Sequence, residues 1–530
     1  MIRVLAGAPA AFTRLEADVL VVGGGIAGLL LATRLASTGK RVVVLESGGM
    51  WQEGETHPLN EVVHLRSVYD GAANGRFRCL GGTSTRWGGA MIPFLPADLA
   101  NGQWPIAHAD LVAYLPEVER LFALPPGRYD FPDLTRRDDN SPPSHLARLA
   151  KWPAFQRRNV AVLLNAELHA EDGPEVWIHA TATRFAFAPN GRLESVEAEA
   201  PDGRRLLVHA TETVIAAGAI ESTRLLLLAN RQHDNQLFAP DGVLGRYFYD
   251  HLLVAVGRIV PADRKALNRV AGFRFEGRGM RNLRFEPTED PAIRAQVPPG
   301  FAHIAFTSPE GSGLDALRAL YRRLQQRRLP DASTLARLAK AAPWLARATW
   351  WRFAERRLLY PSDAAIELHM VIEQRPVAEN RILLSSERID VFGQPLAAID
   401  WGVSREDEAA LTRSTDFFCN LWLASPLVRL GEIDRRSPIE AASELSKGGV
   451  YHPGGSARMG RGPTDGVVDS DFRVFRIPNL SLVSTAAFPT GGGANPTMML
   501  MMAALRTADR LAGRAVLSVR CSGGSSATCG

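Results

Sequence analysis

The chain has 530 residues, of which 46% are hydrophobic and 22% are charged. At roughly 100 to 200 residues per domain, this length permits two to four domains with large cores, and the composition excludes a miniprotein, a disordered chain and a coiled coil. The net charge is +5. Because nearly all the basic residues are arginines, we interpret the excess as genome composition and expect no nucleic-acid partner.

Cysteine content and hydropathy indicate the cellular compartment of the protein. The four cysteines form no CxxC pair and no zinc-type spacing, so the sequence predicts neither a disulfide framework nor a metal site. Arg14 and Glu16 interrupt the first apolar stretch before a signal-peptide core forms, and no uncharged apolar run reaches the ~18 residues of a membrane span. We therefore expect a soluble cytoplasmic protein.

Residues 17–49 predict a strand, a glycine turn, a helix and a second strand, which is half of a Rossmann unit. Gly23, Gly25 and Gly28 fit the G-x-G-x-x-G pattern, which supplies a tight turn, a close backbone approach to pyrophosphate and close helix packing. Glu46 ends the second strand, where a carboxylate can accept hydrogen bonds from ribose hydroxyls. The motif predicts a dinucleotide site without separating FAD from NAD.

Residues 160–217 resemble a run of six short strands with turn signals between them, where an NAD-type repeat would place helices. We expect a β-meander inside the Rossmann domain. The last strand would bring Ala217 and Gly218 close to the nucleotide, before a helix that begins near Glu221. Close packing alone would explain these small residues equally well.

A glycine-rich loop follows the Rossmann unit. Residues 78–90 read RCLGGTSTRWGGA, and with them the chain resembles the glucose-methanol-choline (GMC) family of FAD-dependent oxidoreductases. The likeness recurs in the family's order at VIAAGAIESTRLLLL, GRYFYDH, ENRILLS, YHPGGSARMG and FPTGGGANPT. These blocks span about residues 18–510, and the form of the glycine loop looks most like the sugar-oxidising branch.

The resemblance implies an α/β fold, α+β overall, with a Rossmann-type FAD-binding domain that carries the inserted meander. Residues 15–95, 150–255 and 445–515 would form this domain. Residues 96–149 and 256–444 would form a substrate domain on a mainly antiparallel sheet. The small polar residues of 516–530 predict a disordered tail.

The family also implies where FAD lies. The Rossmann glycines and Glu46 would hold its ADP half, and the loop 81–89 would cover the isoalloxazine. Several members bind FAD covalently through a histidine of that loop, but Arg86 stands at the corresponding place here, so we expect non-covalent FAD. The expected cofactor contacts are Gly23, Gly25, Gly28, Glu46, Gly82, Thr83, Ser84, Trp87, Gly88, Ala217, Gly218, Pro496 and Thr497.

Two residues match the family's catalytic positions. His452, in YHPGGSARMG, would be the base, because a neutral imidazole accepts a proton near pH 7. Asn495, in GANPT, would donate from its amide to the substrate oxygen. Without the resemblance, His452 reads as a turn residue, and Asn495 followed by Pro496 reads as the cap of a helix over 497–512. The roles of Asn495 are compatible. His251 is expected to be structural, and we assign no role to His303.

Residues 311–360 hold 11 Arg or Lys against 3 Asp or Glu, in segments with apolar residues at helical spacing. We expect a basic helical insertion in the substrate domain. Its residues 313–357 suit either solvated arginines on a packed insertion or peripheral contact with an anionic membrane.

The preferred function is FAD-dependent oxidation of a CH–OH group of a small sugar, glycoside or polyol. The alternative is a non-redox or light-driven flavin enzyme of the same fold, such as a lyase or a decarboxylase; a flavin-binding subunit that serves only interaction is a third hypothesis. The sequence leaves the electron acceptor open among oxygen, a quinone and a redox protein.

Overall fold

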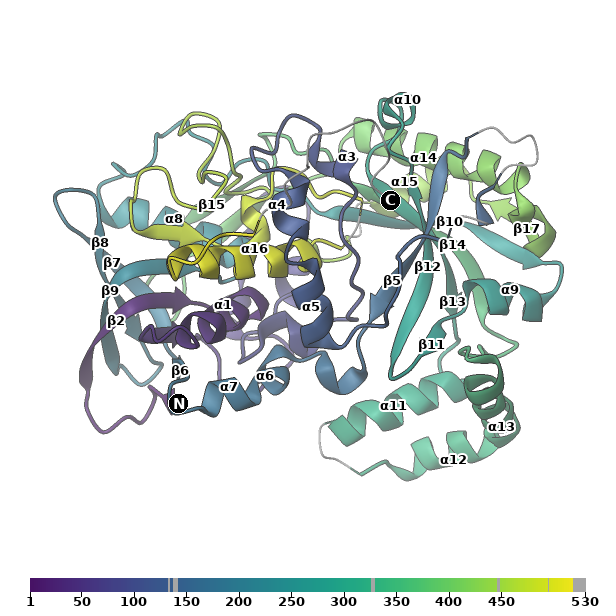
Figure 1. Ribbon diagram of the computed structural model, residues 1–530, viewed down its shortest axis with the longest axis horizontal. Helices are drawn as coiled ribbons and strands as arrows, with labels where there is room; N and C mark the ends of the chain where they lie inside the picture. The colour runs from purple at the N-terminus through teal and green to yellow at the C-terminus, as the bar shows by residue number, and fades with distance from the viewer. Residues whose placement is uncertain (132–133, 137–141, 326–328, 446–448, 494, 518–530) are drawn as a thin grey trace.

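The computed structural model describes residues 1–131, 134–136, 142–325, 329–445, 449–493 and 495–517. Figure 1 shows two bodies side by side: a sheet with helices α1 and α16 against it, and a second sheet that carries β10 to β14. Most of the predicted tail 516–530 lies outside the described residues.

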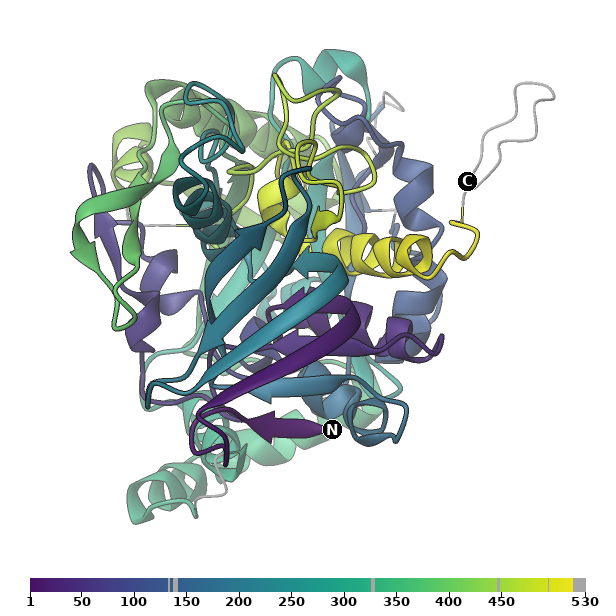
Figure 2. The same ribbon diagram turned by 90° about the vertical axis from the view of Figure 1, so that its left-hand side faces the viewer.

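The first sheet has eight strands in the order β1-β6-β3-β2-β9-β8-β7, with β18 also paired to β9. The pairs that join β1, β6, β3, β2, β9 and β18 are parallel, and β7 and β8 extend the sheet in antiparallel fashion. Figure 2 views this sheet, with the first strands in purple. The strands are β1 Ile2–Val4, β2 Phe12–Val22, β3 Val42–Leu45, β6 Glu175–Ile178, β7 Thr181–Phe187, β8 Leu193–Glu199, β9 Arg205–Ile215 and β18 Leu480–Leu482.

The predicted strand–turn–helix–strand unit is present as β2, α1 and β3. All four residues of β3 are buried, as a central parallel strand requires when helices or loops cover both of its faces. Helix α1 (Ile26–Ala36) buries nearly its whole surface and packs against α16 (Thr497–Leu511), although the two are far apart in sequence (Figure 1). The α/β fold class with a Rossmann-type domain is therefore confirmed.

The inserted region differs from the prediction at both of its ends. Residues expected as the first short strand form helices α6 (Val160–Leu163) and α7 (Asn165–His169). The side chain of Asn159 accepts a hydrogen bond from Ala161 N and so starts α6. The two last predicted strands are one continuous strand, β9. The middle strands are present, and β7, β8 and β9 form an antiparallel meander.

The second sheet has seven strands in the order β11-β12-β13-β14-β10-β17, with β5 also paired to β12. Every pair in it is antiparallel. Its strands are β5 His145–Trp152, β10 His251–Pro261, β11 Arg274–Glu276, β12 Gly279–Pro287, β13 Gly300–Thr307, β14 Ala365–Glu373 and β17 Gly431–Arg435. The domain division stays a prediction, and both β5 and β10 run across its proposed boundaries.

The two faces of this sheet differ in chemistry, because side chains alternate along each strand. One face carries apolar residues such as Phe285, Ala302 and Met370, which share a core with helix α14 (Arg405–Leu423). Arg284, His303 and Glu373 occupy positions of the opposite alternation. The polar face therefore turns away from α14.

Two strands of the expected substrate domain, β15 (Arg381–Ile389) and β16 (Pro395–Asp400), lie outside this main sheet. They form a third sheet in which β16 pairs with β15 on one side and with β4 (Val62–His64) on the other. The other helices are α2 Gly71–Asn74, α3 Pro96–Leu99, α4 His108–Val112, α5 Leu115–Phe122, α8 Ala219–Gln232, α9 Arg264–Ala271, α10 Pro291–Arg294, α11 Gly313–Gln325, α12 Ala332–Lys340, α13 Ala342–Trp350 and α15 Pro438–Leu445. Across the described ranges, no helix has both the length and the apolar character that a membrane span requires.

Candidate active site

A cavity of about 550 Å³ lies where the Rossmann turn meets loops from the rest of the chain. Most of the residues predicted from the sequence line it. Two do not: Gly28 lies behind the glycine turn, and Ser84 points inward. The predicted residues on the cavity wall are Gly23, Gly25, Glu46, Gly82, Thr83, Trp87, Gly88, Ala217, Gly218, His452, Asn495, Pro496 and Thr497.

The glycine turn owes its shape to close backbone contacts. Gly23 has φ +114°, and a Cβ there would lie 2.6 Å from the carbonyl oxygen of Ala216. A Cβ on Gly28 would lie 1.9 Å from the carbonyl oxygen of Gly23, so helix α1 can approach the turn only without a side chain at this position. A Cβ on Gly25 would meet nothing within 4 Å. Packing therefore does not require a glycine at position 25, and the missing side chain keeps space open in the cavity.

Glu46 connects two loops at the cavity wall. Its two carboxylate oxygens accept hydrogen bonds from Gly24 N and Gly48 N, both at 2.8 Å. Burial raises the pKa of Glu46, and the two backbone hydrogen bonds oppose that rise. The carboxylate thus fixes the turn itself and still presents lone pairs to the cavity.

The second glycine loop is joined to the first. Gly81 N donates to Gly24 O at 2.8 Å, and a Cβ on Gly82 would lie 2.9 Å from the Cα of Gly25. Ser84 is 2% exposed; its hydroxyl donates to Gly81 O and accepts from Val160 N at 3.0 Å. Ser84 therefore supports the loop from inside, whereas the neighbouring Thr83 lines the cavity.

A charged cluster that sequence reasoning missed lines the same cavity. Arg78 donates to Glu221 at 2.7 Å and to the side-chain oxygen of Asn60 at 2.9 Å. Arg76 lies beside them, and burial together with the Arg78 charge lowers the pKa of Arg76 to about 9. Arg78 is the first residue of the glycine loop, and Glu221 lies in the block VIAAGAIESTRLLLL, but neither motif indicates that these two side chains meet.

His452 and Asn495 are 43 positions apart in sequence and in direct contact. Asn495 Nδ2 lies 3.1 Å from His452 Nε2. An amide nitrogen can only donate, so Nε2 accepts, and the imidazole is neutral in this arrangement. Burial lowers the pKa of His452 well below 6.5, and the nearby His251 and Arg284 lower it further. The ring therefore stays a proton acceptor at neutral pH.

Arg284, on β12, determines which way the Asn495 amide faces. Its guanidinium donates to Asn495 Oδ1 at 2.9 Å, which leaves Nδ2 toward His452. Arg284 is 3% exposed and lies over the ring of Phe301 at 4.0 Å. Burial lowers the pKa of Arg284 to about 10, which still leaves the group charged at neutral pH. No motif marked this arginine, because its role depends on how β12 packs against the last part of the chain.

The glycine loop 491–493, which precedes Asn495, is held by the polar face of the second sheet and by helix α3. Glu373 accepts from Gly491 N at 3.1 Å, and Asp98 accepts from Gly493 N at 3.2 Å. The His251 ring nitrogen Nε2 lies 2.7 Å from Gly492 O and donates to that carbonyl. His251 is thus a structural residue, as expected, with its ring 5.3 Å from that of His452.

The start of α16 separates the two interpretations of Asn495. The helix begins at Thr497, Pro496 precedes it, and no side chain caps its N-terminus. Because the Asn495 amide is engaged with Arg284 and His452, the expected capping bond is absent. The positive end of α16 nevertheless faces the cavity through Pro496 and Thr497.

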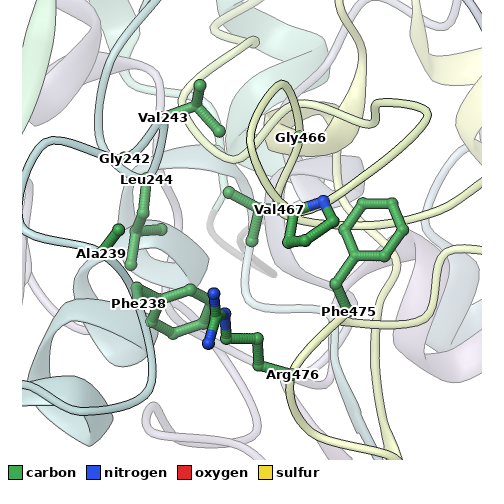
Figure 3. A pocket seen from close by; sticks show the side chains of 10 residues that line it. Phe238, Ala239, Gly242, Val243, Leu244, Gly466, Val467, Phe475 and Arg476 are labelled. Carbon is green, nitrogen blue, oxygen red and sulfur yellow. The ribbon is translucent and has the colours of Figure 1, made fainter.

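A second hollow, of about 20 Å³, has room for about one water molecule. Figure 3 shows the Phe238, Val467, Phe475 and Arg476 side chains around it. None of the predicted site residues lines it, so the large cavity is the candidate site.

The large cavity suits a dinucleotide. The N-terminus of α1, with its unpaired N–H groups, meets a wall that also carries two arginines and an open Gly25. Residues 21–63 match the model of the NAD(P)-binding Rossmann-like domain, and residues 376–504, which include both His452 and Asn495, match the model of GMC oxidoreductases. The likeness to GMC oxidoreductases that the sequence motifs indicated is therefore present in the family match of residues 376–504. Together with full-length relatives that are named dehydrogenases and oxidases, this match supports an FAD-dependent enzyme that acts on CH–OH groups.

Full-length relatives accompany these matches. The chain is 22% identical to 2-methyl-1,2-propanediol dehydrogenase of Mycolicibacterium austroafricanum, over 94% of this chain and 96% of the relative. It is 21% identical to the fructose dehydrogenase large subunit of Gluconobacter japonicus, over 94% and 98%. Among solved structures, pyridoxine 4-oxidase from Mesorbium loti superposes with a TM-score of 0.58 at 16% identity, over 93% and 99% of the chains, which shows a shared fold.

Proposed function

We propose that this protein oxidises a secondary or primary hydroxyl of a small sugar, glycoside or polyol, with His452 as the base. The observation that carries the proposal is the 3.1 Å contact of His452 Nε2 with Asn495 Nδ2 on the wall of the large cavity. A substrate hydroxyl that replaces this hydrogen bond would donate its hydrogen to Nε2 and accept from Nδ2. FAD, when bound, supplies the acceptor for the hydride that the carbinol carbon releases.

Three side chains of the site have separate proposed roles in the reaction. His452 takes the hydroxyl proton, and its lowered pKa keeps Nε2 free to do so at neutral pH. Asn495 holds the substrate oxygen and stabilises the negative charge that grows on it. Arg284 keeps the donor end of the amide toward that oxygen. The expected product is the corresponding carbonyl compound, formed by loss of one proton and one hydride.

Cofactor contacts are assigned to the residues of the cavity wall. Gly23, Gly25 and the N-terminus of α1 suit the diphosphate, and Glu46 suits the ribose hydroxyls. Thr83, Trp87, Gly88, Ala217, Gly218, Pro496 and Thr497 suit the rest of FAD. Gly28 and Ser84 contribute indirectly, through the shape of the two glycine loops.

Relatives support the substrate class. The full-length relatives include enzymes named for a diol and for fructose. A third, 27% identical over 25% of this chain, is named C-glycoside 3-oxidase, from Arthrobacter globiformis. A small molecule with several hydroxyls is the common chemistry.

The test is anaerobic mixing of the FAD-loaded enzyme with a panel of polyols, aldoses, ketoses and glycosides. Loss of the visible absorption of oxidised flavin reports oxidation of the added compound. For the best substrate, His452→Ala should slow this loss by at least ~100-fold, because the proton acceptor is gone. Asn495→Ala should slow it by roughly 10- to 1,000-fold, because one oxyanion donor is gone.

The matched control is His169→Ala, which removes an exposed histidine of α7. The flavin of this variant should be reduced at the same rate as that of the unaltered enzyme. Retention of FAD by all three variants separates a chemical defect from loss of cofactor. Normal reduction of His452→Ala would refute the assignment, and absence of reduction by every alcohol would favour the non-redox alternative.

A further inference from the structure

Helices α11, α12 and α13 and the turn of helix at Trp351–Glu355 form a projection from the substrate half of the molecule. It lies at the lower edge of both Figure 1 and Figure 2. We call residues 313–355 the basic projection. Its inner side is packed: Leu314 belongs to the core of the second sheet, and Trp344 packs against that core.

Every acidic side chain of the basic projection is paired with an arginine. Asp315 pairs with Arg337, Asp331 with Arg323, and Glu355 with Arg269 of α9. The carboxylates are therefore neutralised locally. The remaining exposed charges on α12 and α13 are the cations Lys340 and Arg347.

Helix α12, helix α13 and the turn of helix at Trp351–Glu355 each present an apolar side chain to solvent; together these side chains form what we call the outer side. Leu335 is 52% exposed, Trp350 is 68% exposed and Phe353 is 75% exposed. Ala346, Trp350 and Phe353 recur at helical spacing, so they share one side of the helix, and Ala339 follows Leu335 in the same manner on α12. An exposed apolar surface whose neighbouring carboxylates are all ion-paired, and whose remaining charges are cations, is unusual on a protein that contacts nothing.

We propose that this outer side docks on an anionic lipid bilayer. Trp350 and Phe353 would enter the boundary between headgroups and acyl chains, and Lys340 and Arg347 would contact the anionic headgroups. The absence of exposed acidic groups on the described part of α12 and α13 gives the surface the charge that such a membrane attracts. The proposal concerns attachment and is independent of the reaction at His452.

The test is co-sedimentation of the full-length, FAD-loaded protein with phosphatidylcholine vesicles, with and without phosphatidylglycerol. Binding should require phosphatidylglycerol and should weaken as salt is added, because salt screens surface charge. The double variant Trp350→Ser/Phe353→Ser and the double variant Lys340→Glu/Arg347→Glu should each lower the affinity by at least ~10-fold.

The matched control is Val391→Ser/Ile439→Ser, which removes two exposed apolar side chains elsewhere, 72% and 84% exposed. It should bind like the unaltered chain. Equal unfolding temperatures of all variants exclude misfolding. Absence of vesicle binding, or equal loss in the control, would overturn the proposal. Sedimentation velocity that shows a dimer abolished by Trp350→Ser/Phe353→Ser, without vesicle binding, would assign the surface to a second copy instead.

Discussion

At the scale of single residues, the pairing of an imidazole with an amide gives the site one titrating member. Asn495 carries no charge at any pH, so changes in proton affinity fall on His452 alone. Arg284 influences both residues: it donates to the amide of Asn495, and its charge lowers the pKa of His452. We therefore propose Arg284 as a positioning residue whose effect should appear in the pH dependence.

We predict that Arg284→Met lowers kcat and moves the acidic limb of the rate profile to higher pH. The sign follows from electrostatics. A protonated His452 cannot accept the substrate proton, so the rate falls once the pH drops below its pKa. Removal of a nearby positive charge raises that pKa, and activity is then lost at a higher pH than in the unaltered enzyme. Measurement of kcat/KM from pH 4 to 8 checks this, with pH values chosen around the ordinary histidine pKa of about 6.5.

Arg284→Lys is the comparison. This variant keeps the positive charge but loses the planar guanidinium. The acidic limb of its rate profile should therefore stay at the same pH, while kcat falls. A limb that does not move in Arg284→Met would mean that the guanidinium only fills space.

At the scale of elements, the Rossmann turn contains two glycines that serve different purposes. Gly28 is required by packing, since a Cβ would overlap Gly23 O. Gly25 is open toward the cavity. Substitution of each by the same residue therefore separates folding from cofactor binding.

We predict that Gly28→Ala lowers the unfolding temperature of the apo protein or prevents folding, because the turn and α1 must move apart. Gly25→Ala should fold normally and bind FAD at least ~10-fold more weakly, because its methyl group occupies space that the cofactor approaches. Circular dichroism melts and FAD titration by fluorescence quenching measure the two effects. Normal FAD affinity in Gly25→Ala would place the diphosphate elsewhere.

Sequence reasoning succeeded for elements with a strong local pattern and failed where a short pattern is ambiguous. The unit β2-α1-β3 combines buried runs with spaced glycines, and it was predicted correctly. The short apolar run after Asn159 is compatible with a strand and with a helix. The hydrogen bond that the Asn159 side chain accepts from Ala161 N favours the helix. The sequence also does not indicate which strands pair. Strand β16 pairs with its neighbour β15 and with the distant β4, outside the main sheet.

At the scale of the whole molecule, the site depends on segments that meet only in the folded chain. His452 and Asn495 could be proposed from motifs. The contacts of Arg284 with Asn495 and of Glu373 with Gly491 N could not, because they depend on tertiary packing. The cavity wall is formed by residues from the turn after β2, from 74–90, from the segment after β9 and from 450–500. A cofactor that fills it therefore connects both ends of the sequence.

We predict that FAD is released when the holoenzyme is precipitated with acid, leaving flavin in the supernatant. Arg86, at the place of the family's covalent histidine, is exposed and donates to Gln52 at 2.8 Å. Addition of FAD to the apoenzyme should raise the unfolding temperature with concentration, since ligand at 100 times Kd contributes about 2.7 kcal/mol. Differential scanning fluorimetry measures the shift. Flavin that stays with the denatured pellet would contradict the prediction.

The two proposed catalytic residues, His452 and Asn495, share one segment of the chain with two elements of the fold. Residues from 450 onward supply the base, its amide partner, strand β18 and helix α16. A polypeptide that stops before residue 450 lacks part of the cavity wall and both proposed catalytic residues. Such a truncated chain should therefore leave added FAD oxidised in the presence of an alcohol, because nothing accepts the hydroxyl proton.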